Sequence, residues 1–214
     1  MPRIVETTVF RLDELSEQAR DKARAWYREA SDCDDWHECV FEDFETICAI
    51  LGVRLKTRSV HLYGGGTRQK PCIWFSGFAS QRDGAYFEGN YGFAKGASKA
   101  IHAHALQDGE LHRIADALQA IQRRNFYQLR ADVNQRGRGC HEYCMSIAVE
   151  RDSPNNQAMT ADAEDAVVEL LRDLARWLYR QLEREYDYQT SDEVTDEAIL
   201  ANEYTFTGDG RRFG

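Results

Sequence analysis

Proline is scarce in this chain of 214 residues, and no segment is long and apolar enough to span a membrane. The three prolines, Pro2, Pro71 and Pro154, are scattered, and no Pro- or Ser-rich run could act as a linker. No apolar stretch approaches the ~20 residues of a transmembrane helix, and the N-terminus lacks the apolar core of a signal peptide. These absences predict a single domain over residues 1–214, in the cytoplasm and not bound to a membrane.

Recognisable catalytic and cofactor motifs are also lacking. The chain has no G-x-x-x-x-G-K-[ST] phosphate loop, no G-x-G-x-x-G dinucleotide motif and no G-x-S-x-G nucleophile elbow. Cys33, His37 and Cys39 and the group Cys140, His141 and Cys144 do not follow the spacings of zinc sites. We therefore expect no metal and no cofactor, and the sequence favours a protein that is not an enzyme.

Periodicity predicts a mixture of helices and strands. Apolar residues recur at helical spacing in residues 16–30, 35–51, 109–124 and 161–185, and two shorter helices are expected at 94–105, which is rich in small residues, and at 192–201. Strand character is present in residues 3–10, 53–63, 73–78, 85–88, 127–133, 143–149 and 204–206. Because strands and helices do not alternate regularly, the pattern predicts an α+β fold with a mainly antiparallel sheet and five or six helices.

Two hairpins are expected within this pattern. Asp83-Gly84 is a strong signal for a tight turn in which Gly84 supplies a positive φ. A second hairpin joins the strands at 127–133 and 143–149 through a short loop that contains glycine. In the first of these strands Tyr127 alternates with Leu129, so its side chain is expected to point inward.

The first hairpin is also a candidate site for a small ligand or nucleotide, or for catalysis. Polar side chains there lie among several aromatic residues, and Arg82 offers a two-pronged donor to phosphate or carboxylate. The candidate residues are Ser80, Gln81, Arg82, Asp83 and Glu88. The alternative interpretation is a purely structural hairpin whose aromatic residues belong to the core.

Nucleic-acid binding is a third hypothesis. Basic residues are enriched between residues 94 and 138, and the stripe that could contact phosphates consists of Arg123, Arg124, Arg130, Arg136 and Arg138. An inward Tyr127 and a sequence pI near 5.2 argue against this use. The same arginines could instead contact the acidic C-terminal helices of the chain.

Negative charge is concentrated near the C-terminus. Residues 160–203 contain 13 Asp and Glu against 4 Arg, which equals the net charge of −9 of the whole chain. Much of this charge is compensated within the long helix at 161–185 by arginines three or four residues away. The remaining acidic patch, at 183–203, consists of Glu183, Glu185, Asp187, Asp192, Glu193, Asp196, Glu197 and Glu203.

Several blocks resemble a family of small phage and prophage proteins that are loosely labelled antitoxin of a toxin-antitoxin stability system. The blocks are FSGFASQRDGAYFEG from Phe75, ELHRIA from Glu110, QRRNFY from Gln122, SDEVTDE from Ser191 and ANEYTFT from Ala201. The chain departs from that family by a Gly-containing insertion at 57–71 and by Arg82. The resemblance implies a mobile-element origin and a regulatory or counter-defence role.

Together these observations favour a non-enzymatic phage-type protein that binds and modulates a host protein. It would act as an antitoxin or as an inhibitor of a defence complex, such as an anti-CRISPR protein. The acidic patch could occupy a basic groove of the partner by mimicking nucleic acid. On this hypothesis the partner has a basic surface, and direct nucleic-acid binding is not expected.

Overall fold

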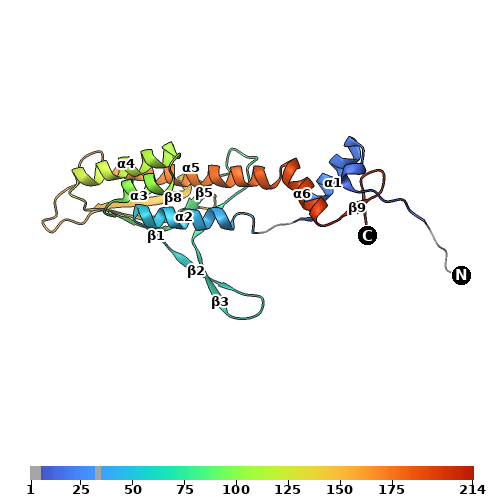
Figure 1. The fold of residues 1–214 in the computed structure, drawn as a ribbon. Coiled ribbons are helices and arrows are strands. Elements are labelled where there is room, and N and C mark those ends of the chain that lie inside the picture. The colour runs from blue at the N-terminus through green and yellow to red at the C-terminus, as the bar shows by residue number, and fades with distance from the viewer. Residues whose placement is uncertain (1–5, 32–34) are drawn as a thin grey trace. The chain divides into compact units, whose positions relative to one another are not determined.

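The computed structural model describes residues 6–31 and 35–214 and has an α+β fold (Figure 1). Contacts between residues divide the chain into two compact units. One consists of residues 1–37 and 184–214, and the other of residues 38–183. We call them the terminal unit and the central unit and describe each by itself.

The central unit is built on a four-stranded antiparallel sheet. Its strands follow the order β1 (Val53–Leu55), β6 (Gly89–Gly92), β7 (Leu129–Gln135) and β8 (Met145–Arg151). Along β7, buried and exposed side chains alternate, as expected for a sheet with one covered face. The register places Asn90 opposite Asp132, and Arg130 opposite Glu150.

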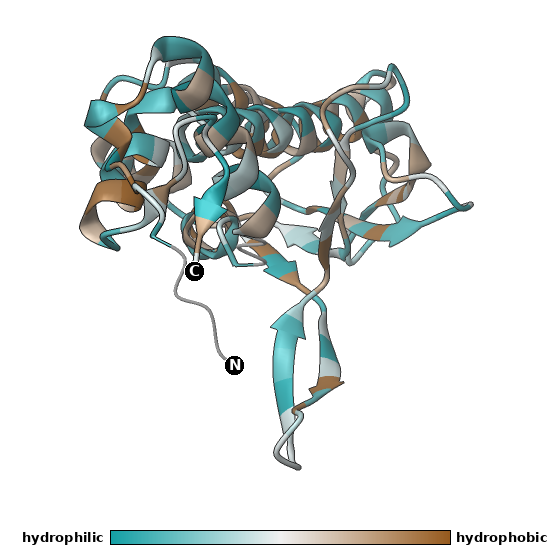
Figure 2. Ribbon diagram, turned by 90° about the vertical axis from the view of Figure 1, so that its right-hand side faces the viewer, coloured by the Kyte–Doolittle hydropathy of each residue, from teal (hydrophilic) through white to brown (hydrophobic). Residues whose placement is uncertain are grey.

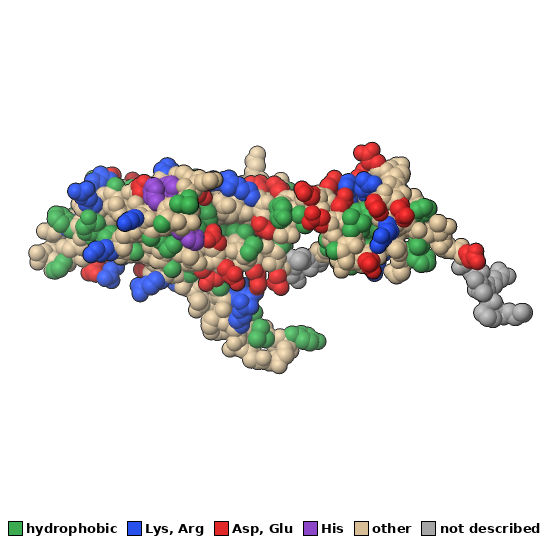
Figure 3. All heavy atoms as spheres, viewed as in Figure 1, with side chains coloured by type: hydrophobic (Ala, Val, Ile, Leu, Met, Phe, Trp, Pro, Cys, Tyr) green, Lys and Arg blue, Asp and Glu red, His purple; other side chains and the backbone are tan. Residues whose placement is uncertain are grey.

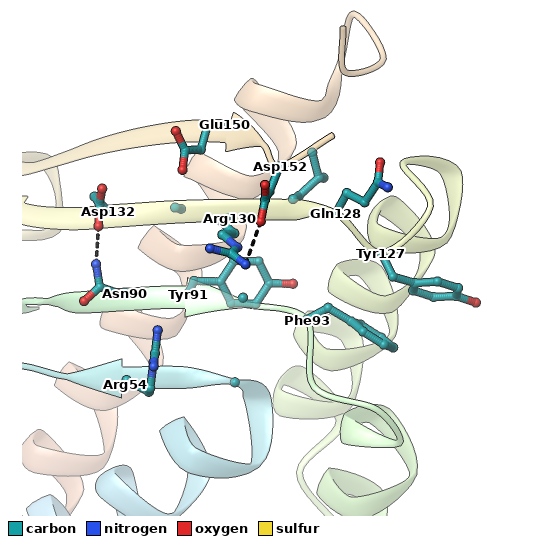
Figure 4. A pocket seen from close by; sticks show the side chains of 14 residues that line it. Arg54, Asn90, Tyr91, Phe93, Tyr127, Gln128, Arg130, Asp132, Glu150 and Asp152 are labelled. Atoms are coloured by element: carbon teal, nitrogen blue, oxygen red, sulfur yellow. Dashed lines mark hydrogen bonds and ion pairs between the residues drawn. The ribbon is translucent and has the colours of Figure 1, made fainter. Parts of the chain in front are cut away.

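Helices cover one face of this sheet, and the other face is open (Figure 4). The helices are α2 (Glu38–Leu51), α3 (Ala97–His104), α4 (Gly109–Arg124) and α5 (Ala163–Gln189), the last of which continues into the terminal unit. Their apolar sides supply most of the core, including the fully buried Phe44, Ile101, Ile114 and Leu171. Asp108 caps α4 by accepting a hydrogen bond from the Leu111 backbone N–H at 2.9 Å.

Two further strand pairs belong to the central unit. Strands β4 (Ile73–Phe75) and β5 (Ala85–Phe87) pair within the body, and all of β5 is buried. Strands β2 (Thr57–His61) and β3 (Thr67–Pro71) form a ribbon that projects away from the helices and the sheet (Figures 1 and 2). A short 3-10 helix, η2 (Glu142–Cys144), precedes β8.

The terminal unit packs the two ends of the chain around a small core. Its elements are the 3-10 helix η1 (Leu12–Glu14), α1 (Glu17–Ala30), α6 (Asp192–Ala201), β9 (Thr205–Phe206) and β10 (Arg212–Phe213). Leu12, Ala23, Ile199 and Phe206 are buried in this core. Gly210 adopts φ +84°, and a Cβ there would lie 2.1 Å from the Ala19 carbonyl oxygen, so only glycine fits.

The predicted α+β class and antiparallel sheet are confirmed, and most helix boundaries agree within three residues. Two expectations for strands are wrong. Within the expected strand at 3–10, residues 3–5 lie outside the described residues and only Phe10 forms an isolated β-bridge, to Phe206. The Asp83-Gly84 turn is not tight either, because the β4–β5 pair ends at Phe75 and Ala85 and the loop 76–84 connects them.

Gly84 also has a different role from the expected one. It is not among the residues with positive φ, but a Cβ there would lie 3.0 Å from His141 Cα. The glycine therefore permits close packing against residues 140–141 and does not make a tight turn.

The buried Gln122 side chain connects α4 to β7. Its Oε1 accepts a hydrogen bond from the Leu129 backbone N–H at 3.1 Å, and its Nε2 donates to the Leu129 carbonyl at 2.8 Å. The same Nε2 lies 3.3 Å from the Tyr91 hydroxyl, whose pKa burial raises to about 12. One amide thus satisfies both backbone groups of the first residue of β7.

Replacement of this amide is therefore expected to destabilise the protein. Gln122→Leu leaves the N–H and carbonyl of Leu129 buried without partners, which costs about 2–4 kcal/mol of unfolding free energy. Chemical denaturation measures the change, and Gln119→Leu on the exposed side of the same helix is the matched control. Equal stability of the two variants would contradict this role of Gln122.

Candidate protein-binding surface

Helix α4 ends in an unusual version of a common helix-terminating motif. The Tyr127 backbone N–H donates to the Gln122 carbonyl at 2.7 Å, and the Phe126 N–H donates to the Arg123 carbonyl at 3.3 Å. This pair of hydrogen bonds defines the Schellman motif, in which a left-handed glycine normally follows the helix. Here the left-handed residues are Phe126, with φ 58°, and Tyr127, with φ 62°.

Buried hydrogen bonds hold this turn in place. Asn125 has no exposed surface, and its Nδ2 donates to the Ile121 carbonyl at 3.0 Å and to Thr160 Oγ1 at 3.1 Å. Its Oδ1 accepts from the Thr160 backbone N–H at 2.9 Å. The turn is therefore fixed to the segment that leads into α5.

The two left-handed residues present their side chains to solvent. Phe126 is 70% exposed, Tyr127 is 45% exposed, and the Tyr127 ring lies 4.4 Å between centroids from that of Phe93, which is 38% exposed. The Arg151 guanidinium lies 5.2 Å from the Phe126 ring centroid. We call Phe93, Phe126, Tyr127 and Arg151 the aromatic surface.

Arg151 is held by its neighbours and is not a mobile surface side chain. It donates to the Gln128 side chain at 2.9 Å, to the Ala158 carbonyl at 2.8 Å and to the Gln157 side chain at 2.9 Å. Its geometry is thus fixed before any partner binds, which reduces the entropy lost on binding.

A polar hollow of about 740 Å³ lies on the open sheet face beside the aromatic pair (Figure 4). Gly92 keeps its floor open, because a Cβ there would project into free space. Figure 4 shows charged and amide side chains above the strands, with Phe93 and Tyr127 at one end. The side chains that line the hollow include Arg54, Asn90, Gln128, Arg130, Asp132, Glu150 and Asp152.

These polar side chains are partly paired with one another. Arg130 contacts Asp152 at 2.6 Å, and Asn90 donates to Asp132 across the neighbouring strands. Arg54 and Glu150 form no ion pair with any residue that the structure describes. The hollow therefore keeps one cation and one anion available to a ligand.

Charges of both signs surround the aromatic surface. The cations are Arg54, Arg123, Arg124, Arg130 and Arg151, and the carboxylates are Asp132, Glu150, Asp152 and Asp162. Arg124 is paired with Asp162 at 2.7 Å. With five arginines and four carboxylates, this region is close to neutral.

The fold and this surface define an α+β protein with a helix-covered antiparallel sheet whose open face carries exposed aromatic and arginine side chains. The chain belongs to the family of the domain of unknown function DUF8835, whose model matches residues 36–192. No curated protein and no solved structure matches it. The aromatic surface and the hollow lie within the matched region, whereas most of α6 lies beyond it.

Three of the hairpin residues proposed to bind a ligand accept hydrogen bonds from backbone N–H groups. Asp83 Oδ2 accepts from the backbone N–H groups of Ala79 at 3.0 Å and Ser80 at 2.7 Å. Ser80 Oγ accepts from the Arg82 N–H at 3.2 Å, and Gln81 and Arg82 are exposed. Glu88 accepts from the Gln135 N–H at 3.0 Å, so the two carboxylates of this candidate site both stabilise backbone. The ligand site stays a hypothesis.

The arginine stripe is split between the two ends of β7. Arg123, Arg124 and Arg130 lie near the start of the strand, whereas Arg136 and Arg138 follow its end. Arg130 and Arg136 are six residues apart, which is about 20 Å along an extended strand. The expectation of an inward Tyr127 is wrong, because β7 begins only at Leu129 and the left-handed turn points the ring outward.

The acidic patch is partly compensated within the terminal unit. Arg24 binds Asp196 with two hydrogen bonds, at 2.7 and 2.6 Å, and also contacts Asp192 at 3.0 Å. Arg28 contacts the other Asp192 oxygen at 2.5 Å, and these arginines lower the pKa of Asp192. The arginines that contact these two aspartates thus come from α1. The sequence had suggested that arginines between residues 123 and 138 would contact the acidic helices.

The other acidic residues have few partners. Glu185 accepts a hydrogen bond from Gln189 at 2.8 Å. The members that form no ion pair with any described residue are Glu183, Glu185, Asp187, Glu193, Glu197 and Glu203. Among these, Glu183 belongs to the central unit and the others to the terminal unit.

Among residues 6–31 and 35–214, no group of three His, Cys, Asp or Glu side chains is arranged to hold a metal ion. Cys33, one of the cysteines considered for zinc, lies outside the described residues. Burial raises the pKa of the Cys140 thiol to about 11, which keeps it protonated at neutral pH. Nor is any helix in the described part of the chain both long and apolar enough to cross a bilayer.

The strained turn leads to a stability prediction. Left-handed backbone costs about 1–2 kcal/mol for an ordinary residue and less for asparagine, and the exposed Phe126 ring contributes little burial. Phe126→Asn is therefore expected to leave the unfolding free energy unchanged or to raise it by up to ~1 kcal/mol, measured by chemical denaturation.

Phe126→Ala is the control, because it removes the ring but keeps the backbone strain. It should be less stable than Phe126→Asn. If the unfolding free energy of the asparagine variant falls by more than ~1 kcal/mol, the Phe126 ring stabilises the fold. That result would argue against a role of the ring in binding.

Proposed function

We propose that this protein is a non-enzymatic binding protein that recognises a host protein through the aromatic surface. The observation that carries the proposal is the strained turn at Phe126 and Tyr127, which exposes two aromatic rings. Strain of this kind persists where the surrounding contacts enforce it, and it concentrates at functional sites.

The chemistry of the surface favours a protein partner. Aromatic residues and arginine are enriched at the centres of protein interfaces, where a few such side chains supply most of the binding energy. The exposed Phe126 and Tyr127 rings and the preorganised Arg151 provide this combination. The hollow beside them could receive a polar segment of the partner, with Arg54 and Glu150 as its unpaired charges.

The local charge balance decides between a protein and a single-stranded nucleic acid. Nucleic-acid sites rely on cations that neutralise phosphates. Here carboxylates nearly equal the arginines, and Arg124 and Arg130 already contact aspartates. The carboxylates would repel a phosphate backbone next to each arginine that attracts it. A protein surface, in contrast, can place charges of opposite sign against both the arginines and the carboxylates.

The resemblance to antitoxin-labelled phage proteins adds the biological part of the proposal. The partner would be a host protein, and binding would modulate it, as an antitoxin or an inhibitor of a defence complex does. The protein would then act in the cytoplasm of the host cell.

The proposal is tested by retention of proteins from host lysate on the immobilised full-length chain. Wild type is compared with Phe126→Asn/Tyr127→Asn, and with Leu106→Ser, a 78% exposed apolar residue outside the aromatic surface, as control. The expected result is a defined partner that wild type and the control retain and the double variant loses at least tenfold.

Re-binding of the purified partner, by calorimetry, then confirms direct contact. Retention of the same proteins by all three forms would refute the aromatic surface as the site. If nuclease treatment of the lysate abolishes the same retention that Phe126→Asn/Tyr127→Asn loses, the ligand of the aromatic surface is nucleic acid.

The acidic patch supports a second candidate contact with a basic partner. Glu193 and Glu197 are one turn apart on α6, exposed and without ion pairs among the described residues. They could dock on a basic groove and speed association at low salt.

If so, Glu193→Lys/Glu197→Lys slows association with the captured partner and weakens its salt dependence, with little change in dissociation rate. Surface plasmon resonance at two salt concentrations measures both rates. The matched control is Glu17→Lys/Glu29→Lys at two exposed positions of α1, which changes the net charge equally. Equal rates for both double variants would exclude a specific role for α6.

A further inference from the structure

Among the residues that the structure describes, no third strand pairs with the β2–β3 ribbon, residues 57–71. None of its residues is buried, and β2 and β3 pair with each other from Thr57 opposite Pro71 to His61 opposite Thr67. Figure 2 shows the ribbon projecting from the rest of the central unit. Isolated two-stranded ribbons of this kind are only marginally stable in water. We call this segment the arm, and its exposed faces and edges are suited to an external ligand.

The arm has one sign of charge in a chain that is strongly acidic. Residues 54–82 contain six Lys and Arg and no Asp or Glu, whereas the whole chain carries −9. Three of these cations, Arg58, Arg68 and Lys70, are in the arm. In the space-filling view, basic side chains lie near the base of the arm and hydrophobic ones toward its tip (Figure 3).

Strand register gathers the three cations on one face. Arg58 lies opposite Lys70, and Val60 lies opposite Arg68. Residues opposite each other in an antiparallel pair share a face, and so do residues two apart on one strand. The other face carries neutral polar groups, including Ser59 and Gln69, which hydrogen-bond at 2.7 Å.

The tip of the arm is apolar and exposed. Leu62 is 49% exposed and Tyr63 completely exposed, and the turn continues through Gly64, Gly65 and Gly66. Gly65 and Gly66 have positive φ, and the Leu62 N–H donates to the Gly66 carbonyl at 3.1 Å. The glycines therefore form a narrow turn, and the Tyr63 ring beside it is open to solvent.

Partners within the chain compensate the arm only near its base. Lys70 contacts Glu38 at 3.4 Å, and Arg58 lies over the Trp74 ring at 5.6 Å. Glu45 of α2 also interacts with this face. Burial and the neighbouring Glu42 raise the pKa of Glu45, and the positive charge of Arg68 partly offsets that rise. Arg68 has no ion pair among the residues that the structure describes.

We propose that the arm binds B-form duplex DNA, with its cationic face on phosphates and the Leu62-Tyr63 tip in the major groove. The major groove of B-DNA is about 12 Å wide and admits a two-stranded β-ribbon. Apolar area on the arm is too small for a protein hot spot, whereas three cations on one face, of which Arg68 forms no ion pair with a described residue, suit phosphates. This inference concerns a different surface from the aromatic one and does not depend on a protein partner.

The geometry also distinguishes DNA from RNA. A-form duplexes have a deep and narrow major groove that protein elements cannot enter, so duplex RNA should bind more weakly than duplex DNA of the same sequence. Each strand of the arm extends for about 17 Å, which exceeds the ~10 Å Debye length at 0.1 M salt. Acidic residues beyond the base of the arm are therefore screened from DNA at the tip, whereas Glu38 stays beside Lys70 at the base.

The test is fluorescence anisotropy with a labelled 20-base-pair DNA duplex and the matching RNA duplex, using the full-length protein. DNA is expected to bind with a Kd between about 1 and 100 μM, the range of nonspecific DNA binding. Neutralisation of two to three phosphates predicts a loss of about 10- to 40-fold in affinity between 50 and 200 mM salt.

Variants locate the contact. Arg68→Gln should lower affinity and reduce the salt slope by about 0.9, and Tyr63→Ser should weaken DNA binding without changing that slope. Arg138→Gln removes the same charge from an exposed loop and is the matched control. Unchanged melting temperatures establish that the variants are folded.

Several results would overturn the proposal. They are absence of DNA binding at 50 mM salt, equal or tighter binding of duplex RNA, and equal effects of Arg68→Gln and Arg138→Gln. Loss of DNA binding in Phe126→Asn/Tyr127→Asn with an unaffected arm variant would also overturn it, because that would assign DNA to the aromatic surface.

Discussion

The junction between the end of α4, the start of β7 and the entry to α5 is the constraint on which the central unit depends. Two buried amides make it. Gln122 satisfies both backbone groups of Leu129, and Asn125 binds Thr160 through both ends of its side chain. Since unpaired polar groups at these positions would be buried, the helix, the strand and the following segment are fixed together. The exposed turn at 126–127 is a direct consequence of this junction.

The same junction explains how an unfavourable turn is maintained. A glycine after Asn125 would close the helix with less strain, yet Phe126 and Tyr127 adopt left-handed backbone in sequence. The hydrogen bonds of Gln122 and Asn125 hold the chain on both sides of the turn, so the strain is tolerated at that point. Its result is an aromatic surface of fixed geometry beside a polar hollow, and a rigid surface loses less entropy on binding than a flexible one.

Elements with a clear apolar periodicity were predicted from the sequence. Elements that depend on contacts between residues far apart in the chain were missed. Helix α4 was predicted closely because an apolar stripe at helical spacing marks it. The central strand β6 was missed because Gly-Asn-Tyr-Gly has no strand signal. Gly89 is there because a Cβ would lie 2.5 Å from the Arg54 carbonyl, a contact that only the sheet creates. Likewise, the turn at Phe126 lacks the glycine by which such turns are recognised, so the alternation of Tyr127 with Leu129 falsely indicated an inward ring.

Charge is distributed so that the two proposed surfaces do not compete. The arm is basic, the aromatic surface nearly neutral, and the exposed side of α6 acidic. An acidic chain repels nucleic acid in general, so a short basic arm that extends beyond the Debye length would make DNA contact local. The neutral aromatic surface would then gain nothing from phosphate and remain free for a protein. In this arrangement a partner bound at the sheet and a duplex bound at the arm can be held by one chain through different physical forces, apolar burial at the first and counterion release at the second.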